Sequence, residues 1–278
     1  MNALELSNVS KKYSSFRLNH INLTLPKGCI MGLIGENGAG KSTLMKLILN
    51  MIPKDSGTIS VLGQDPKIVS VKEDIGVVLD EAGYPECITP HQLNCIFKNI
   101  YHQWQEDLYF SLVNQLSLPL HQEFKQFSRG MKMKLSIAAA LSHQPKLLIL
   151  DEATSGLDPV IRDEVVGLFN EFTRDESHAI LISSHIVSDL EKLCDYIAFL
   201  HKGNLLLCEE KDRLLEQYGV IHYTPEQNIQ IPKNAIIGKK ATPYGIEAVV
   251  KRGQIPNGIE INQIGIEDLF IVMARGNE

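Results

Sequence analysis

The N-terminal part of the chain alternates between apolar and polar residues. Residues 4–9 and 18–25 both follow this period of two, which is typical of strands with one buried face. Residues 26–28, Pro-Lys-Gly, form a turn signal directly afterwards. We therefore expect two half-buried strands at the start of the chain.

Other short runs are apolar almost without interruption and predict strands that are buried on both faces. These runs are residues 29–34, 75–79, 146–150 and 179–184. A further strand is expected over residues 58–62, after a dense turn signal. Solid apolar strands separated by longer segments favour an α/β fold with a parallel sheet.

Helical spacing fills most of the intervening chain. Helices are expected over residues 44–49, 131–141, 160–174 and 186–194, and the whole stretch 89–142 lacks β-branched runs and has a helical pattern. Thr89 precedes Pro90, the pattern of an N-cap followed by a first-turn proline. Trp104 in this stretch is expected to be a packing residue.

The C-terminal part of the chain has a different character. Residues 196–200 and 204–208 predict a hairpin around Lys202 and Gly203. From about residue 219, short alternating segments at 229–231, 246–250 and 258–261 suggest strands of a small accessory unit, closed by an amphipathic helix over 266–274.

Composition narrows the class of protein. The 278 residues suit one large α/β domain with an appendage, or two domains. The chain is 44% hydrophobic, with a net charge of −6, so we expect no nucleic-acid partner. We also expect no membrane span and no secretory signal. The five cysteines include no CxxC pair, which suggests reduced thiols and neither a zinc site nor a disulfide framework.

The most informative motif is the Walker A pattern GxxxxGK[ST], which residues 35–43 match at every fixed position. It lies between a predicted strand and a predicted helix, the context of a phosphate-binding loop. Backbone N–H groups of such a loop surround a phosphate, and the helix N-terminus adds partial positive charge. A glycine-rich turn without a ligand is the alternative. The candidate nucleotide-binding residues are Gly35, Glu36, Asn37, Gly38, Ala39, Gly40, Lys41, Ser42 and Thr43.

Side chains of this loop and of a second motif are expected to contact the phosphates, the metal ion and the attacking water. Lys41 is expected to reach the terminal phosphates, and the Ser42 hydroxyl to ligate Mg²⁺. Asp151 and Glu152 follow the apolar strand 146–150, which is the Walker B pattern. Asp151 is expected in the Mg²⁺ shell, and Glu152 is placed to polarise an attacking water.

Weaker candidates lie beside these motifs. His185 follows the strand 179–184, and Asp80 follows the strand 75–79; such positions border the ligand crevice of an α/β sheet. Asp80 is equally well explained as a solvated loop acid. Ser128 and Gly130 begin a helix, where they form either an anion-binding point or an ordinary cap. Tyr13 is either a nucleobase-stacking residue or a surface residue.

Taken together, these motifs resemble the nucleotide-binding subunit of an ABC transporter, over residues 1 to about 215. The resemblance implies a P-loop NTPase fold of ABC type with an antiparallel β subdomain, a helical subdomain at about 84–142 and a small C-terminal α+β extension. It divides the chain into a nucleotide-binding domain, 1–218, and an accessory region, 219–278.

The same resemblance assigns roles to individual residues. It implies that Tyr13 stacks on adenine, that Glu152 is the catalytic base and that His185 senses the γ-phosphate. Asp158 falls in the D-loop. Ser128 and Gly130 fall in the family signature, which has Arg129 at its first glycine, Met131 at its glutamine and Phe127 at its leucine.

A second departure from the family pattern is Asp80, which stands where the family has the Q-loop glutamine. Aspartate can ligate Mg²⁺, but it brings a charge that glutamine lacks. In the signature, Arg129 adds a cation that the resemblance places near the phosphates of the partner's nucleotide.

The implied mechanism is a pair of such subunits, a homodimer or a heterodimer, that binds two MgATP head to tail. Each site takes its Walker A loop from one chain and its signature from the other. ATP hydrolysis then drives a separate membrane permease, with export favoured, at the cytoplasmic face of the cell membrane. The main alternative is a soluble ABC ATPase of an assembly complex. A GTPase is disfavoured because no Asn-Lys-x-Asp motif is present, and a kinase does not explain Ser128, Gly130 or His185.

Overall fold

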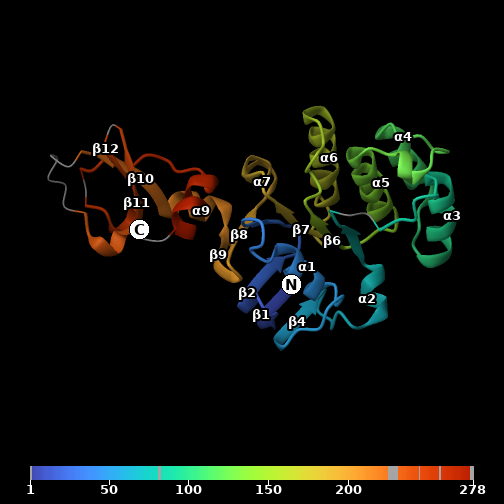
Figure 1. Cartoon of the computed structure of the whole chain (residues 1–278), viewed down its shortest axis with the longest axis horizontal. Helices are drawn as coiled ribbons and strands as arrows, with labels where there is room; N and C mark the ends of the chain where they lie inside the picture. The colour runs from blue at the N-terminus through green and yellow to red at the C-terminus, as the bar shows by residue number, and fades with distance from the viewer. Residues whose placement is uncertain (1, 81–82, 225–230, 244, 257, 276–278) are drawn as a thin grey trace.

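The computed structural model describes residues 2–80, 83–224, 231–243, 245–256 and 258–275. Its centre is a sheet of six strands in the order β5-β6-β7-β3-β8-β9 (Figure 1). The neighbours from β5 to β8 pair in parallel, and β9 pairs antiparallel with β8. The strands are β3 (Ile30–Ile34), β5 (Ile75–Val78), β6 (Leu147–Asp151), β7 (Ala179–Ser184), β8 (Tyr196–His201) and β9 (Asn204–Glu210).

Two antiparallel sheets and a set of helices complete the described part of the chain. The first sheet has the order β2-β1-β4 and contains β1 (Asn2–Lys12), β2 (Arg17–Pro26) and β4 (Ser56–Val61). The second has the order β10-β12-β11 and contains β10 (Tyr218–Tyr223), β11 (Ile236–Thr242) and β12 (Gly245–Lys251). The α-helices are α1 (Lys41–Ile48), α2 (Val69–Glu73), α3 (Pro90–Ile100), α4 (Glu106–Gln115), α5 (Arg129–Ser142), α6 (Pro159–Phe172), α7 (Val187–Leu193), α8 (Lys211–Gln217) and α9 (Ile266–Arg275), with 3₁₀ turns at Phe124–Gln126, Lys233–Ala235 and Arg252–Gln254.

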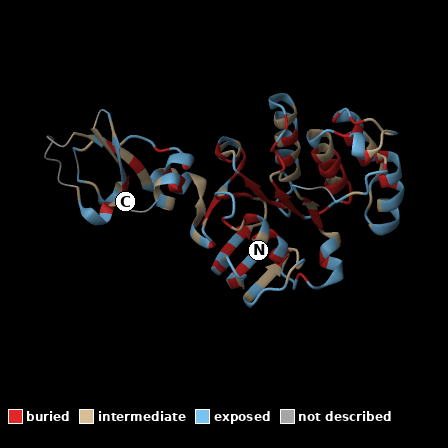
Figure 2. Cartoon of the chain, viewed as in Figure 1, coloured by how far each residue is buried: buried red, intermediate tan, exposed pale blue. Residues whose placement is uncertain are grey.

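The central strands are buried on both faces, as their solid apolar runs predict. Every residue of β3, β6 and β7 is buried. Alternate residues of one strand belong to two different cores, because successive side chains point to opposite faces. Met31 and Leu33 pack in a cluster with Leu44 of α1, whereas Ile30 and Ile34 pack in the cluster that contains the helices on the other face. Figure 2 shows this burial through the sheet and along the inner sides of the helices.

The helical stretch begins as its sequence predicts. Thr89 caps α3 with a capping box, in which the Gln92 N–H donates to Thr89 Oγ1 at 3.2 Å and the Thr89 N–H donates to Gln92 Oε1 at 3.0 Å. The predicted packing role of Trp104 is confirmed, since its ring centroid lies 5.4 Å from that of Phe97 and 5.2 Å from that of Tyr109, against the buried core. Its Nε1 also donates to Asn94 Oδ1 at 2.8 Å. None of the helices in the described residues is long and apolar enough to cross a membrane.

The C-terminal region differs from its sequence-based prediction. The predicted hairpin is confirmed as β8 and β9, and the predicted last helix as α9. Of the three accessory strands expected beyond residue 219, only 246–250 is confirmed, within β12; β10 and β11 carried no recognised signal. Residues 229 and 230 of another predicted strand lie outside the described residues.

The predicted strand over residues 258–261 is wrong. The Arg252 guanidinium donates to the carbonyls of Tyr218, Ile261 and Asn262, at 2.7, 3.4 and 2.8 Å. The Ile261 carbonyl therefore accepts from a side chain and not from a strand partner. Just after this segment, the single bridge from Val220 to Asn262 pairs the chain with β10.

The last helix joins this accessory region to the central domain. The backbone N–H of Ile266, at the start of α9, donates to Glu191 Oε1 of α7 at 2.6 Å. Phe270 of α9 packs edge-on against Phe199 of β8, with ring centroids 5.2 Å apart. Figure 1 accordingly shows α9 between the second antiparallel sheet and the end of the central sheet.

We predict that Phe270→Ala lowers the free energy of unfolding by about 3 kcal/mol, the scale of removing a buried phenyl ring from a packed core. Phe270 is 8% exposed, whereas its neighbour Ile271 is 37% exposed. Urea denaturation followed by fluorescence measures the difference. Ile271→Ala is the matched control and is expected to change stability by no more than about 0.5 kcal/mol. Equal effects of the two substitutions would show that the contact between α9 and β8 does not stabilise the fold.

Candidate functional site

The glycine-rich loop connects β3 to α1, which is the strand–loop–helix order that the sequence predicts. Gly38 and Gly40 have φ values of +81° and +110°, in the region that side chains with a Cβ rarely adopt. Gly40 is also the N-cap of α1. The loop therefore needs glycine at both positions to turn its backbone into the helix start.

Two predicted loop residues face the β8–β9 hairpin instead of the cavity. A Cβ at Gly35 would lie 2.5 Å from the Leu200 carbonyl oxygen, so only glycine allows this approach. The Ala39 carbonyl accepts a hydrogen bond from the Gly203 N–H at 3.0 Å, and Ala39 is buried. These contacts hold the loop against the sheet.

Lys41, the first residue of α1, has a buried ammonium group. The residue is 6% exposed, and its Nζ donates to the Gly35 carbonyl at 2.7 Å. The same Nζ lies 3.8 Å from Glu152 Oε1. The ammonium is thus enclosed by its own loop and faces an acid from a different strand.

Asp151 and Glu152 are fixed by the neighbouring strand β7. The Ser183 hydroxyl donates to Asp151 Oδ1 at 2.5 Å, and the Glu152 N–H donates to both the carbonyl and the hydroxyl oxygen of Ser183, each at 3.2 Å. Glu152 has a φ of +55°, an uncommon value for a residue with a side chain. Such backbone outliers concentrate at functional sites.

His185 completes this group. Its Nδ1 lies 2.6 Å from Glu152 Oε2, and its side chain is 54% exposed, compared with 13% for Glu152. The residues Lys41, Glu152 and His185 come from elements that follow β3, β6 and β7, which are adjacent in the sheet. Because the carboxyl ends of parallel strands meet at one edge, three residues far apart in the sequence meet at one point.

A cavity of about 530 Å³ opens beside this group. Ten of the predicted residues line it: Glu36, Asn37, Gly38, Gly40, Lys41, Ser42, Thr43, Asp80, Asp151 and Glu152. Ser15 and Phe16 also line it and were not predicted from the sequence.

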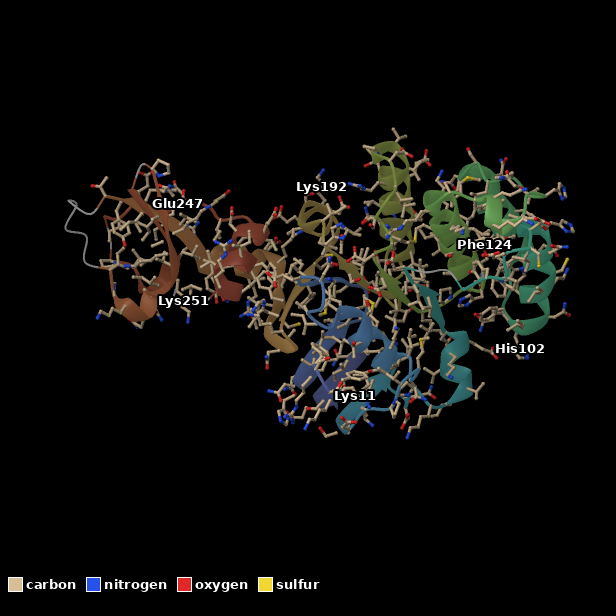
Figure 3. The ribbon with its side chains drawn as sticks, in the orientation of Figure 1. Lys11, His102, Phe124, Lys192, Glu247 and Lys251 are labelled. Carbon is tan, nitrogen blue, oxygen red and sulfur yellow. The ribbon has the colours of Figure 1, made fainter. Side chains whose placement is uncertain are left out.

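The aromatic side chain at the cavity is Phe16 rather than Tyr13. Tyr13 is 42% exposed and is not among the lining residues. Its ring centroid lies 5.6 Å from the Nζ of Lys11, which is labelled in Figure 3. The Phe16 ring lies against Gly40, where an added Cβ would be 2.6 Å from Cζ. The Tyr13 N–H donates to the Phe16 carbonyl at 2.7 Å, so one tight turn presents both rings. A second aromatic residue in the same loop was the signal that could have identified Phe16.

His185 is not among the residues that line the cavity, and three further predicted residues lie outside the cavity of this chain. Ser128 caps α5, where its hydroxyl accepts from the Met131 N–H at 3.2 Å, and Asp158 caps α6 by accepting from the Ile161 N–H at 3.1 Å. Gly130 lies next to Gly156, whose carbonyl oxygen would be 3.4 Å from an added Cβ. The structure therefore gathers these residues in a second group, apart from the loop that holds Lys41.

The residues at the cavity suit a magnesium ion that arrives with a nucleotide. Ser42 and Asp151 supply a hydroxyl and a carboxylate, the hard oxygen donors that Mg²⁺ prefers. In the part of the chain that the structure describes, no group of three or more His, Cys, Asp or Glu side chains is arranged for a metal. Mg²⁺ is usually held by one or two carboxylates together with substrate phosphates, and this sparse donor set fits that pattern.

Comparisons with known proteins agree with this geometry. The family profile "ABC transporter" matches residues 18–155. The lantibiotic transport ATP-binding protein SrtF of Streptococcus pyogenes is 36% identical over 212 residues, which are 75% of this chain and 91% of SrtF. The bacitracin transport ATP-binding protein BcrA of Bacillus licheniformis is 33% identical over an alignment of 309 residues that covers 98% of this chain and 97% of BcrA. A solved structure described as the ATP binding subunit of an ABC transporter is 27% identical, with a TM-score of 0.70, over 77% of this chain and 92% of that one.

The fold and the site together define a P-loop nucleotide hydrolase of the ABC type. The chain belongs to the family of ABC transporter ATP-binding subunits, and it binds and hydrolyses ATP. The kinase and GTPase alternatives are thereby excluded.

We predict that Ser183→Ala lowers ATPase activity about tenfold or more and raises the magnesium concentration needed for half-maximal rate, the scale of losing a group that orients a metal ligand. The reason is that the Ser183 hydroxyl holds both Asp151 and the Glu152 N–H. Steady-state phosphate release at varied magnesium concentration measures the effect.

Ser142→Ala is the matched control for Ser183→Ala. Ser142 is also fully buried, and its hydroxyl also donates a hydrogen bond, at 2.6 Å to the Ala138 carbonyl within α5. We expect this variant to keep the magnesium dependence of the unmodified chain. An unchanged magnesium dependence in Ser183→Ala would show that the backbone alone orients Asp151.

Proposed function

We propose that this chain powers a transporter whose membrane permease is a separate polypeptide, and that it works at the cytoplasmic face of the cell membrane. The relatives SrtF and BcrA are both named as transport ATP-binding proteins, and this chain spans 91% of one and 97% of the other. The chain thus corresponds to nearly the whole of a subunit that is itself named for ATP binding within a transport system.

The observation that carries the proposal is the meeting of Lys41, Glu152 and His185 at one edge of the sheet. Lys41 is placed to bind the terminal phosphates of ATP. Glu152 orients the attacking water and accepts its proton, and the 2.6 Å contact from His185 Nδ1 holds the Glu152 carboxylate in place. Ser42 and Asp151 would hold Mg²⁺, which neutralises developing charge on the phosphates when it is bound.

A second ATP-binding subunit completes each site in this proposal. Ser128, Gly130 and Asp158 lie outside the cavity of their own chain, but the start of α5 has a neutral serine cap and first-turn N–H groups without an intrahelical acceptor, which favours an anion. Two chains arranged head to tail, as a homodimer or a heterodimer, would bring Ser128 and Gly130 to the phosphates of the partner's nucleotide. ATP then holds the pair together, and hydrolysis releases it.

Export is the direction we propose. The supporting observation is the similarity to relatives named for transport of a lantibiotic and of bacitracin, at 36% and 33% identity. The cargo itself would be selected by the permease.

We predict that Glu152→Gln reduces ATP hydrolysis by about 10² or more, the scale of a positioned proton-transfer group, while ATP binding persists. The variant is expected to accumulate as an ATP-bound dimer, measured by phosphate release and by light scattering during gel filtration. Glu171→Gln is the control, because Glu171 is an exposed acid of α6 paired with Arg174. Full hydrolysis by Glu152→Gln would remove Glu152 from the role of catalytic base.

The permease is tested by purifying the tagged chain from detergent-solubilised membranes of its native host. We expect a stoichiometric partner with several predicted membrane spans. Recovery only with soluble partners would leave the ATPase site intact and favour the assembly-complex alternative.

A further inference from the structure

Two residues that depart from the family pattern form an ion pair with each other. Arg129 Nη2 lies 2.5 Å from Asp80 Oδ1. Arg129 is the first residue of α5, and Asp80 follows β5 and lines the ATP cavity. Each residue replaces an uncharged one, a glycine in the signature or a glutamine in the Q-loop, and the two introduced charges are opposite.

Arg129 also touches a third segment of the site. A Cβ added to Gly156 would lie 3.6 Å from Arg129 Cδ and 3.9 Å from Nε, so the stem of the arginine passes over this glycine. Gly156 has a φ of +74° and belongs to the segment that leads from Glu152 to α6. The guanidinium is therefore directed to Asp80 by contacts with the same chain.

The charges that line the cavity explain why Asp80 needs a partner. Glu36, Asp80, Asp151 and Glu152 are acids, and Lys41 is the one cation among the described lining residues. ATP is a polyanion, so each acid that lacks a counter-charge weakens its binding. Glu152 faces Lys41, and Asp151 is suited to a metal ion, whereas the counter-charge of Asp80 comes from Arg129.

We propose that Arg129 is a positioning residue for ATP binding in its own chain, because it neutralises Asp80 and holds that carboxylate at the rim of the cavity. This inference rests on the ATP site of the proposed function and is independent of the permease. It differs from a role in which Arg129 serves only the phosphates of the partner's nucleotide.

The expected effect of Arg129→Gln is an increase in the KM for MgATP of about three- to fivefold, the upper range for an exposed ion pair, with little change in kcat. Arg129→Lys keeps a cation and is expected to stay close to the unmodified chain. The double variant Asp80→Asn with Arg129→Gln removes the unpaired acid and is expected to restore KM to within about twofold.

The decisive experiment is a double-mutant cycle on the full chain with two readouts. The first is KM and kcat for MgATP, and the second is the equilibrium Kd of a fluorescent ATP analogue measured in EDTA, where hydrolysis does not occur. Circular dichroism verifies that each variant is folded. Lys125→Gln is the matched control, since Lys125 pairs with Glu123 in the same subdomain with similar exposure but outside the cavity.

Rescue by Asp80→Asn in both readouts would support the proposal. If the double variant binds ATP as weakly as Arg129→Gln, the proposal is overturned and Arg129 is assigned to the partner's phosphates. A lack of ATPase activity in the unmodified chain would instead overturn the proposed function, so the two failures are distinguishable.

Discussion

The buried ammonium of Lys41 is the constraint on which the site depends. A cation removed from water is costly unless it is paired and hydrogen-bonded. Here the carbonyl of Gly35 and the carboxylate of Glu152 supply those contacts, and each residue directly follows a different strand of the sheet. The loop can curl around Lys41 only because Gly38 and Gly40 adopt positive φ values. The acid can face it only because Glu152 adopts a positive φ directly after β6. Left-handed backbone conformations on both sides of the cavity are thus linked to one desolvated charge.

Strand order brings the residues of the candidate site together around this local constraint. β7 lies between β3 and β6, so the strand that carries the loop and the strand that carries the acids never pair directly. Ser183 lies near the end of β7 and His185 just beyond it, so both residues lie between β3 and β6. They make hydrogen bonds to Asp151 and Glu152. If β3 and β6 were adjacent, no strand between them would place Ser183 and His185 beside the acids. The parallel arrangement is in turn possible because the apolar strands are covered on both faces.

The sequence was informative wherever a function depends on consecutive residues. The glycine loop, the apolar strands that end in acids and the cap at Thr89 are local patterns, and the structure has each element where it was predicted. The missing information concerns contacts between distant segments. Ser183 is one serine in an apolar run, and its hydrogen bond to Asp151 depends on strand register. The Asp80–Arg129 pair joins residues 49 positions apart. Phe16 and Tyr13 share a loop, and no periodicity distinguishes which ring faces the cavity. In the accessory region, Arg252 donates to the carbonyl of Ile261, a residue that the alternating pattern had assigned to a strand.

The boundary near residue 218, drawn from a change in composition, does not separate two independent cores. Ile266, Leu269 and Phe270 of α9 belong to the same buried cluster as Leu190, Leu193 and Phe199 of the central domain. The small sheet β10-β12-β11 has a modest cluster of its own, but the helix that closes the chain completes the larger core. The hydrogen bond from the start of α9 to Glu191 is also close to His185 in sequence, because α7, which carries Glu191, begins two residues after His185. A segment that stabilises α7 therefore also fixes the strand end from which His185 reaches Glu152. The accessory region in this physical sense supports the candidate site.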